Sequence, residues 1–168
     1  MKSIGLNLQV KIFKPGTIKK VFTPYNTLVW EEITLPNFYK HIKKYFQPSG
    51  KLMEEFTKEE LTGYLVGRYT AYHENGKVKT EAEFFNGRNT DVRTGSWKYY
   101  NPQGNIDSIK QYKSGVEYWP NKELKTAGGF IFDSKNEKWV KTGEWRWYDE
   151  QGKLKDSKTF PMGREQVN

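Results

Sequence analysis

Tyrosines and cations recur at matching places along the chain, and they form its best candidate for a recognition surface. Lys98 stands two residues before Tyr100, Arg146 stands two residues before Tyr148, and Tyr72 holds the same place in an earlier segment. Side chains two residues apart on a strand share a face, and tyrosine and arginine are favoured at binding hot spots. The alternative is structural: the tyrosines fix neighbouring hairpins and the cations pack over their rings. The full set of candidate binding residues is Tyr72, Lys98, Tyr100, Tyr118, Trp119, Arg146 and Tyr148.

Catalytic and metal-binding chemistry has no such candidate. The two histidines, His41 and His73, are far apart, and neither lies near Cys, Asp or Glu residues at the spacing of metal ligands. The chain has no cysteine, no phosphate-binding glycine loop and no nucleophile elbow. Neighbouring acids such as Glu54 and Glu55 face opposite ways on a strand, which separates their carboxylates. The sequence therefore predicts a protein that is not an enzyme and that holds no cofactor or metal.

A repeated pattern supplies the elements that position the candidate residues. It has the form Gly-x-Tyr/Trp-x-x-Tyr-x-x-x-Gly and begins at Gly67, Gly95 and Gly143. The segment from the first glycine to the second aromatic residue is typical of a strand, and the second glycine marks a turn with a left-handed backbone. Each copy is therefore predicted to be a β-hairpin that stacks on the next. A degenerate copy is expected at 118–132, where Lys122 replaces the turn glycine and should strain the turn or change its type.

The chain before Gly67 shows other patterns. Alternation of apolar and polar residues predicts strands over about 6–12, 18–23 and 27–35. Apolar positions three and four residues apart predict a short amphipathic helix over 36–46. Thr57 and Glu60 match a capping box, which predicts one or two helical turns ending near Gly63. In an alternative interpretation residues 45–52 are a degenerate copy of the repeat, so that 37–56 is either helix or a degenerate repeat.

Together these patterns predict a mainly β fold. We expect an antiparallel meander of tandem β-hairpin repeats in an open, elongated single sheet, with one or two short N-terminal helices. Residues 1–56 would form a basic segment of strands and helix. Residues 57–168 would form the hairpin repeats, at about 67–87, 95–115, 118–132 and 143–163.

The composition indicates a basic protein that packs with aromatic residues. The net charge is +8, and residues 1–56 carry nine Lys against four Glu. Such an excess steers acidic partners, whether protein, nucleic acid or a membrane surface, or it is simply a solvated face. Aromatic residues make up 16% of the chain, which suits thin sheets whose side chains are half covered. The N-terminus lacks the apolar run of a secretory signal and no stretch reaches membrane-spanning length, so a cytoplasmic location is expected.

The hairpin copies resemble the MORN-repeat variant found in bacterial antitoxin-like and immunity-like proteins. The resemblance covers about residues 67–163 and implies an elongated meander of hairpins with a protein-binding role, which in some members neutralises a partner toxin. It supplies no catalytic residues. The residues that carry it, with their equivalents in the other copies, are Gly95, Trp97, Tyr99, Tyr100, Gly104, Ile106, Tyr112 and Gly115.

We therefore expect a non-enzymatic binding protein whose repeat sheet engages a protein partner, with a toxin or effector that it neutralises as the finer hypothesis. The rival hypothesis is an anionic ligand, a nucleotide or nucleic acid, held by tyrosine stacking and Lys/Arg, for example in interference between phage and host. A third hypothesis, lipid head groups, requires the N-terminal lysines to form one patch. The sequence leaves the partner and the oligomeric state open.

Overall fold

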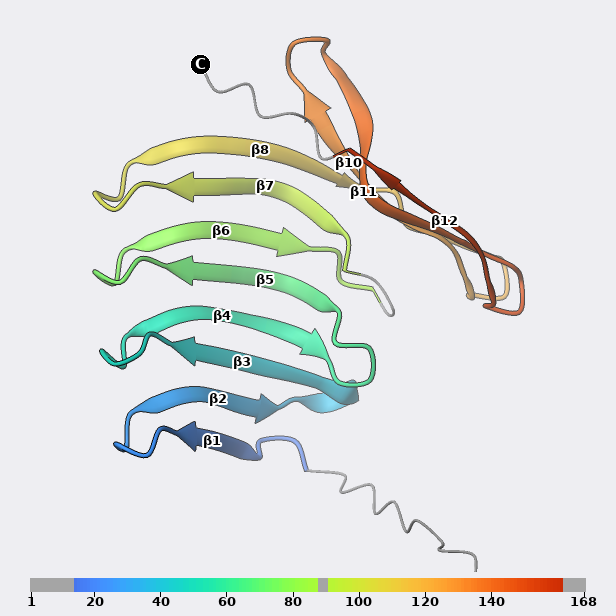
Figure 1. Cartoon of the computed structure of the whole chain (residues 1–168). Helices are drawn as coiled ribbons and strands as arrows, with labels where there is room; N and C mark the ends of the chain where they lie inside the picture. Colours follow the sequence, from blue (N-terminus) through green and yellow to red (C-terminus); the bar gives the residue numbers. More distant parts are fainter. Residues whose placement is uncertain (1–13, 88–90, 162–168) are drawn as a thin grey trace, which may run out of the picture.

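Residues 14–87 and 91–161, which the computed structural model describes, form one antiparallel sheet of twelve strands (Figure 1). Strands adjacent in sequence pair in order from β1 to β8, followed by β10, β11 and β12, while β9 pairs with β10 alone. The expected open meander of hairpins is confirmed. The strands are β1 (Ile18–Phe22), β2 (Leu28–Thr34), β3 (Tyr39–Tyr45), β4 (Leu52–Glu59), β5 (Leu65–Tyr72), β6 (Val78–Phe84), β7 (Arg93–Tyr100), β8 (Ile106–Ser114), β9 (Glu117–Tyr118), β10 (Leu124–Asp133), β11 (Lys138–Tyr148) and β12 (Leu154–Phe160).

Five of the hairpins turn in the same way. In the β5–β6 hairpin the His73 amide donates to the Lys77 carbonyl and the Gly76 amide donates to the His73 carbonyl, both at 2.8 Å. The same two bonds close the turns at 23–27, 101–105, 119–123 and 149–153. At the fourth turn position φ is positive, and Lys122 takes a φ of 71° where Gly76 takes 86°. The degenerate unit thus keeps the turn of the repeat, and Lys122 adopts a backbone conformation that favours glycine.

The opening glycine of each repeat has a role that the sequence patterns did not indicate. Gly67, Gly95 and Gly143 have φ values of 64°, 68° and 66°. Each lies where its strand carries extra residues opposite the preceding strand, as in a glycine-type β-bulge. A Cβ on Gly67 or Gly143 would meet no atom within 4 Å, so the backbone conformation, rather than crowding, favours glycine at these two positions.

Both helical predictions for the N-terminal segment are wrong. Residues Pro36–Phe38 form a single 3-10 turn, and the residues after it form β3. Lys40, Ile42 and Lys44 alternate with residues of the opposite face, and pairing with both β2 and β4 outweighs the helical spacing of the apolar residues. Thr57 lies within β4 and its hydroxyl is 3.3 Å from the His41 ring, so it caps no helix. Residues 14–87 and 91–161 contain no α-helix, and thus no helix suited to crossing a membrane.

The N-terminal hairpins and the repeats share one continuous sheet. The strands expected at 18–23 and 27–35 are confirmed as β1 and β2, whereas the strand expected at 6–12 lies outside the described residues. Residues 45–52 form a hairpin turn between β3 and β4, where the Gly50 amide donates to the Phe46 carbonyl at 2.8 Å, and the alternative interpretation of this stretch as a degenerate copy of the repeat stays a prediction. Residues 56 and 57 both lie inside β4, and pairing with β3 continues through this point, whereas the register with β5 shifts there.

A row of aromatic rings forms the main core on one face of the sheet. Adjacent rings in the row have centroids 5.3 to 6.4 Å apart, in stacked, edge-on or tilted contact. All are buried except one, which is half-buried, and Ala82 fills the space among them. Such contacts stabilise aromatic pairs beyond simple burial. The rings, in order across β4–β8, belong to Phe56, Tyr69, Phe84, Trp97 and Tyr112.

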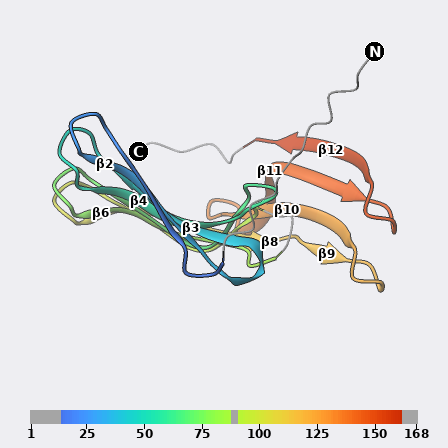
Figure 2. The same ribbon diagram turned by 90° about the horizontal axis from the view of Figure 1, so that it is seen from below.

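The last four strands diverge from the rest of the sheet, as the view from below shows (Figure 2). Strand β10 pairs with β8 through only Gly129–Ile131. Opposite the single residue Gly128, β11 carries the three residues Gly143–Trp145, which disrupts the regular register. The Trp145 ring fills the resulting space, since a Cβ on Gly128 would lie 2.1 Å from its Cδ2 atom. A second small core of Val92, Leu124 and Ala127 forms at this divergence.

Candidate binding site

The two faces of β1–β8 differ in charge. Side chains alternate along a strand and cross-strand partners share a face, so the register assigns each residue to a face. We call the face with the aromatic row the basic face and the other the polar face. The basic face has six strand cations and two strand acids, namely Lys19, Lys40, Lys44, Lys58, Arg93 and Lys110 against Glu32 and Glu54.

The polar face is balanced. Successive cross-strand partners from β1 to β7 alternate in sign, except at one threonine, in the order Lys20, Glu31, Lys43, Glu55, Thr70, Glu81 and Lys98. If the bulge residues Lys79 and Asp107 are left aside, this face has five strand cations and five strand acids. Besides the lysines and glutamates of that series, these are Arg68, Lys113, Glu59 and Glu83. Opposite charges placed directly across a sheet stabilise one another. The polar face therefore offers a partner little net field.

Both acids of the basic face are already paired. Lys40 Nζ lies 2.7 Å from Glu32 Oε1, and this interaction raises the pKa of Lys40. Lys44 Nζ lies 2.6 Å from Glu54 Oε1, and the Tyr69 hydroxyl donates to Glu54 Oε2 at 2.7 Å. Burial, and then the bond to Glu54, raises the pKa of the Tyr69 phenol. Neither strand acid of this face is therefore left to pair with Lys19 or Lys58.

Several cations of the basic face lie over aromatic rings. Lys19 Nζ is 5.3 Å from the Trp30 ring centroid, and Arg93 Cζ is 4.6 Å from that of Trp97. Lys44 Nζ lies 5.1 Å from the Phe56 ring centroid, and Lys110 Nζ lies 5.5 Å from that of Tyr99. Each such contact is worth about 0.5 to 1 kcal/mol at an exposed site. The cations therefore form a layer above rings that are buried or half-buried.

Lys58 is the basic-face cation with the least favourable surroundings. Its cross-strand partners are Lys40 on β3 and Leu65 on β5. It is half-buried, and within the described residues its side chain makes no ion pair, hydrogen bond or ring contact. Like charges directly opposite each other destabilise a sheet. Lys40 is bound by Glu32 and Glu60, so Lys58 alone retains an unmatched charge in this pair.

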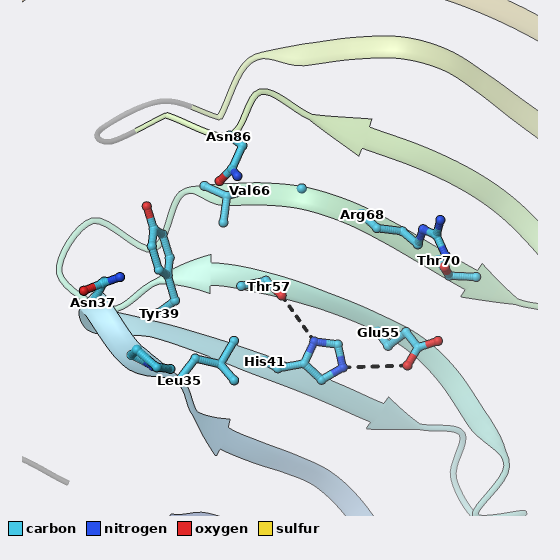
Figure 3. Close-up of a pocket in the computed structure, with 12 residues that line it drawn as sticks. Leu35, Asn37, Tyr39, His41, Glu55, Thr57, Val66, Arg68, Thr70 and Asn86 are labelled. Atoms are coloured by element: carbon cyan, nitrogen blue, oxygen red, sulfur yellow. Dashed lines mark hydrogen bonds and ion pairs between the residues drawn. The ribbon is translucent and has the colours of Figure 1, made fainter. Parts of the chain in front are cut away.

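A hollow of about 640 Å³ opens on the polar face across β3–β5 (Figure 3). Inside it His41 Nδ1 lies 3.3 Å from the Thr57 hydroxyl, and His41 Nε2 lies 3.7 Å from Glu55 Oε2. Arg68 borders this hollow and also a neighbouring one of about 380 Å³, which Lys98 lines from β7. The two hollows form a groove whose cations and acids alternate.

One of the sequence-predicted residues, Lys98, lines this groove, and two others, Tyr72 and Tyr100, bond to carboxylates that line it. Tyr72, Lys98 and Tyr100 share the polar face, as the alternation of side chains predicts. The Tyr72 hydroxyl donates to Glu55 at 2.7 Å, and burial together with this bond raises the pKa of Tyr72 to about 12. The Tyr100 hydroxyl donates to Glu81 at 2.6 Å, which raises the pKa of Tyr100. Both hydroxyls are thus occupied within the sheet.

Arg146 does not continue this row. It is 8% exposed and its guanidinium stacks 4.8 Å from the Tyr64 ring centroid, with Nη1 donating to the Tyr64 hydroxyl. Its Nη2 lies 3.3 Å from Asp91 Oδ1. Arg146 therefore ties the diverging strand β11 to the loops that follow β4 and β6. Its burial leaves little of the side chain for a partner to reach.

The remaining predicted residues lie in the diverging strands. Trp119 Nε1 donates to the Tyr148 carbonyl at 3.3 Å, which joins the turn after β9 to β11. Lys125 Nζ lies 5.1 Å above the Trp119 ring, and Tyr118 is 45% exposed. The structure thus separates the seven predicted residues into a polar-face group and a C-terminal group. Partner binding by either group stays a prediction.

Sequence reasoning missed the basic face. A helical turn was expected from Thr57 to Gly63, which hid the place of Lys58 opposite Lys40 on a sheet. The signal that could have found it is parity: Lys40, Ile42 and Lys44 alternate with His41 and the residues after it, as in a strand. Among the described residues no cluster of three His, Asp or Glu side chains is arranged to hold a metal ion.

Comparison with known families agrees with the hairpin geometry. No curated protein matches the chain. Residues 65–86, 93–114 and 141–160 match the family model described as the MORN repeat variant. The first two segments cover the hairpins β5–β6 and β7–β8, and the third covers most of β11 and β12. These three segments of the chain are therefore MORN-repeat variant units.

Proposed function

We propose that this chain is a non-enzymatic binding protein that engages a protein partner through its repeat sheet. One observation carries the proposal: six cations share the basic face with two acids, and both acids are already paired. An unbalanced face of this kind attracts and orients a charged partner. The broad, open sheet suits a macromolecular surface better than a small molecule.

Two features favour a protein partner over a nucleotide or nucleic acid bound by stacking. Base stacking needs open aromatic faces, whereas the rings of the basic face are mostly buried and have cations above them. On the polar face the hydroxyls of Tyr72 and Tyr100 are held by carboxylates, whose negative charge would repel phosphate. The rival hypothesis is therefore kept as an outcome of the test.

We further propose, on the resemblance to antitoxin-like and immunity-like proteins, that the partner is a toxin or effector which binding neutralises. The test is co-expression of the chain with the protein that it captures, with growth of the host cell as the measurement. Relief of growth inhibition by the wild-type chain supports the finer proposal. A captured protein that is harmless alone would remove it and leave the binding function standing.

Affinity capture from the native host tests the binding function. Nuclease-treated lysate is passed over the wild-type chain and over Lys58→Glu/Lys98→Glu, which reverses one cation on each face of the sheet. The matched control, Lys135→Glu/Lys155→Glu, reverses two exposed cations, one in the β10–β11 connection and one on the edge strand β12. We expect one protein to be retained by the wild type and control and lost from the sheet variant. Equal retention by all three chains, or no retained protein, would contradict the proposal.

A further inference from the structure

We infer that the partner docks an acidic protein surface on the basic face, and that its carboxylates reach Lys58 and Lys19. This inference rests on the proposed function and adds the face and the chemistry of the partner. Lys19 is exposed on β1, and Lys58 is half-buried on β4. Both cations point to the same side of the sheet, because Lys19 pairs with Glu32, Glu32 with Ile42, and Lys40, which shares the face of Ile42, with Lys58.

The charge pattern argues for carboxylates. Glu32 and Glu54 are paired with Lys40 and Lys44, and within the described residues Lys19 and Lys58 have no ion pair, so a carboxylate of the partner would supply the matching charge. Complementary charge raises the rate of encounter and suppresses wrong partners. The polar face cannot play the same part for an acidic surface, because its own acids alternate with its cations.

Lys58 is the expected centre of the contact. Lys58 is the cross-strand partner of Lys40, and the Cβ atoms of such partners in an antiparallel pair lie about 5 Å apart. A carboxylate placed beside Lys58 would relieve this like-charge repulsion. Because Lys58 is half-buried, such an ion pair is screened less by solvent than one at an exposed site.

Nucleic acid fits the basic face less well than protein carboxylates do. A single strand binds by stacking bases on aromatic rings as well as by neutralising phosphates. Here Trp97 is 7% exposed with Arg93 above its ring, and Phe56 is 9% exposed with Lys44 above its ring. These two rings are therefore closed to bases.

The direct test is a binding titration with a fluorescent peptide that carries Glu at every third position. The matched probe carries Gln at the same positions, and a single-stranded oligonucleotide is the third probe. Lys19→Glu/Lys58→Glu reverses two cations of the basic face, and Lys98→Glu/Lys113→Glu reverses two of the polar face as the control. We expect the basic-face variant to bind the Glu peptide at least about tenfold more weakly than the wild type, since reversal converts two attractive pairs into repulsive ones.

A second variant separates binding from folding. Lys58→Gln removes the unmatched charge, so we expect its Tm to rise by about 1–2 °C while its affinity for the Glu peptide falls roughly two- to fivefold. A cation with a purely structural role would show the opposite change in Tm and no change in affinity. Thermal unfolding followed by circular dichroism measures the Tm, and fluorescence anisotropy measures the affinity for the Glu peptide.

Three results would overturn the inference. In the first, the Glu and Gln peptides bind with equal affinity. In the second, the basic-face and polar-face variants lose equal affinity for the Glu peptide. In the third, the oligonucleotide binds more tightly than the Glu peptide, and the basic-face substitutions abolish its binding. Failure here is distinct from failure of the proposed function. If affinity capture still retains a protein partner, the chain remains a binding protein and only the acidic chemistry of its partner is refuted.

Discussion

Replacing Lys122 by glycine should stabilise the protein. Lys122 has a φ of 71° in a turn whose equivalent position is glycine in three other hairpins. A left-handed backbone costs a residue with a Cβ about 1–2 kcal/mol, and the greater freedom of glycine in the unfolded chain returns about 0.4–1 kcal/mol of this. The net gain is about 0.5–1 kcal/mol, or a rise in Tm of about 1–4 °C for a chain of this size.

The reverse substitution provides the matched control. Gly76→Lys places the same side chain in an equivalent turn, and a Cβ there would meet no atom within 4 Å. We expect this variant to lose about 0.5–1 kcal/mol, because the same backbone cost is partly offset by the reduced freedom of the unfolded chain. Urea denaturation of both variants, with the dependence on urea concentration unchanged, measures the two values. A less stable Lys122→Gly, or a neutral Gly76→Lys, would refute the conclusion that this turn position favours glycine.

Three further substitutions test other parts of the structure. Gly128→Ala should cost about 1–3 kcal/mol in urea denaturation, because its Cβ would lie 2.1 Å from a ring atom of Trp145; an unchanged midpoint would contradict this packing. Tyr72→Phe should lower stability below pH 10 by about 0.5–1 kcal/mol through loss of the bond to Glu55. Since folding raises the pKa of Tyr72 from 10.0 to about 12, this difference should vanish as the pH rises through about 12, and a constant difference would count against it. Arg146→Met should cost about 2 kcal/mol and release the C-terminal strands to faster hydrogen exchange, and unchanged exchange would argue against its tying role.

The hairpins were predictable because local chemistry marks them repeatedly. The turn glycines indicate positions with a left-handed backbone conformation. Alternation of side chains around Trp97 and Tyr99 correctly places both on the face opposite Tyr100. Two neighbouring strands complete each unit, so no distant contact is needed to specify it. For this reason the meander and the degenerate hairpin follow from the sequence.

The N-terminal strand β3 illustrates where local patterns fail. Phe38, Ile42 and Tyr45 have helical spacing, yet the same stretch alternates with a period of two. Pairing of β3 with β2 and β4 stabilises the strand and so decides between the two periods. A pattern read within a stretch of about eleven residues does not contain this pairing.

The placement of Arg146 and Lys58 depends on features that no local pattern contains. Arg146 follows a segment in which three residues of β11 stand opposite one residue of β10, and this irregular register directs it toward Tyr64. The charge surplus of the basic face emerges only when the register pairs Lys58 with Lys40. Parity along single strands separated the two faces, but their relative charge required the whole sheet.

Site-specific photo-cross-linking in the native host tests the central claim most directly. A photo-reactive amino acid replaces Lys58 on the basic face in one variant and Lys98 on the polar face in another, and both are irradiated in living cells. We predict a covalent adduct with one protein from position 58 and none from position 98. An adduct from position 98 alone, equal adducts from both positions, or none from either would contradict the claim that the basic face binds a protein partner.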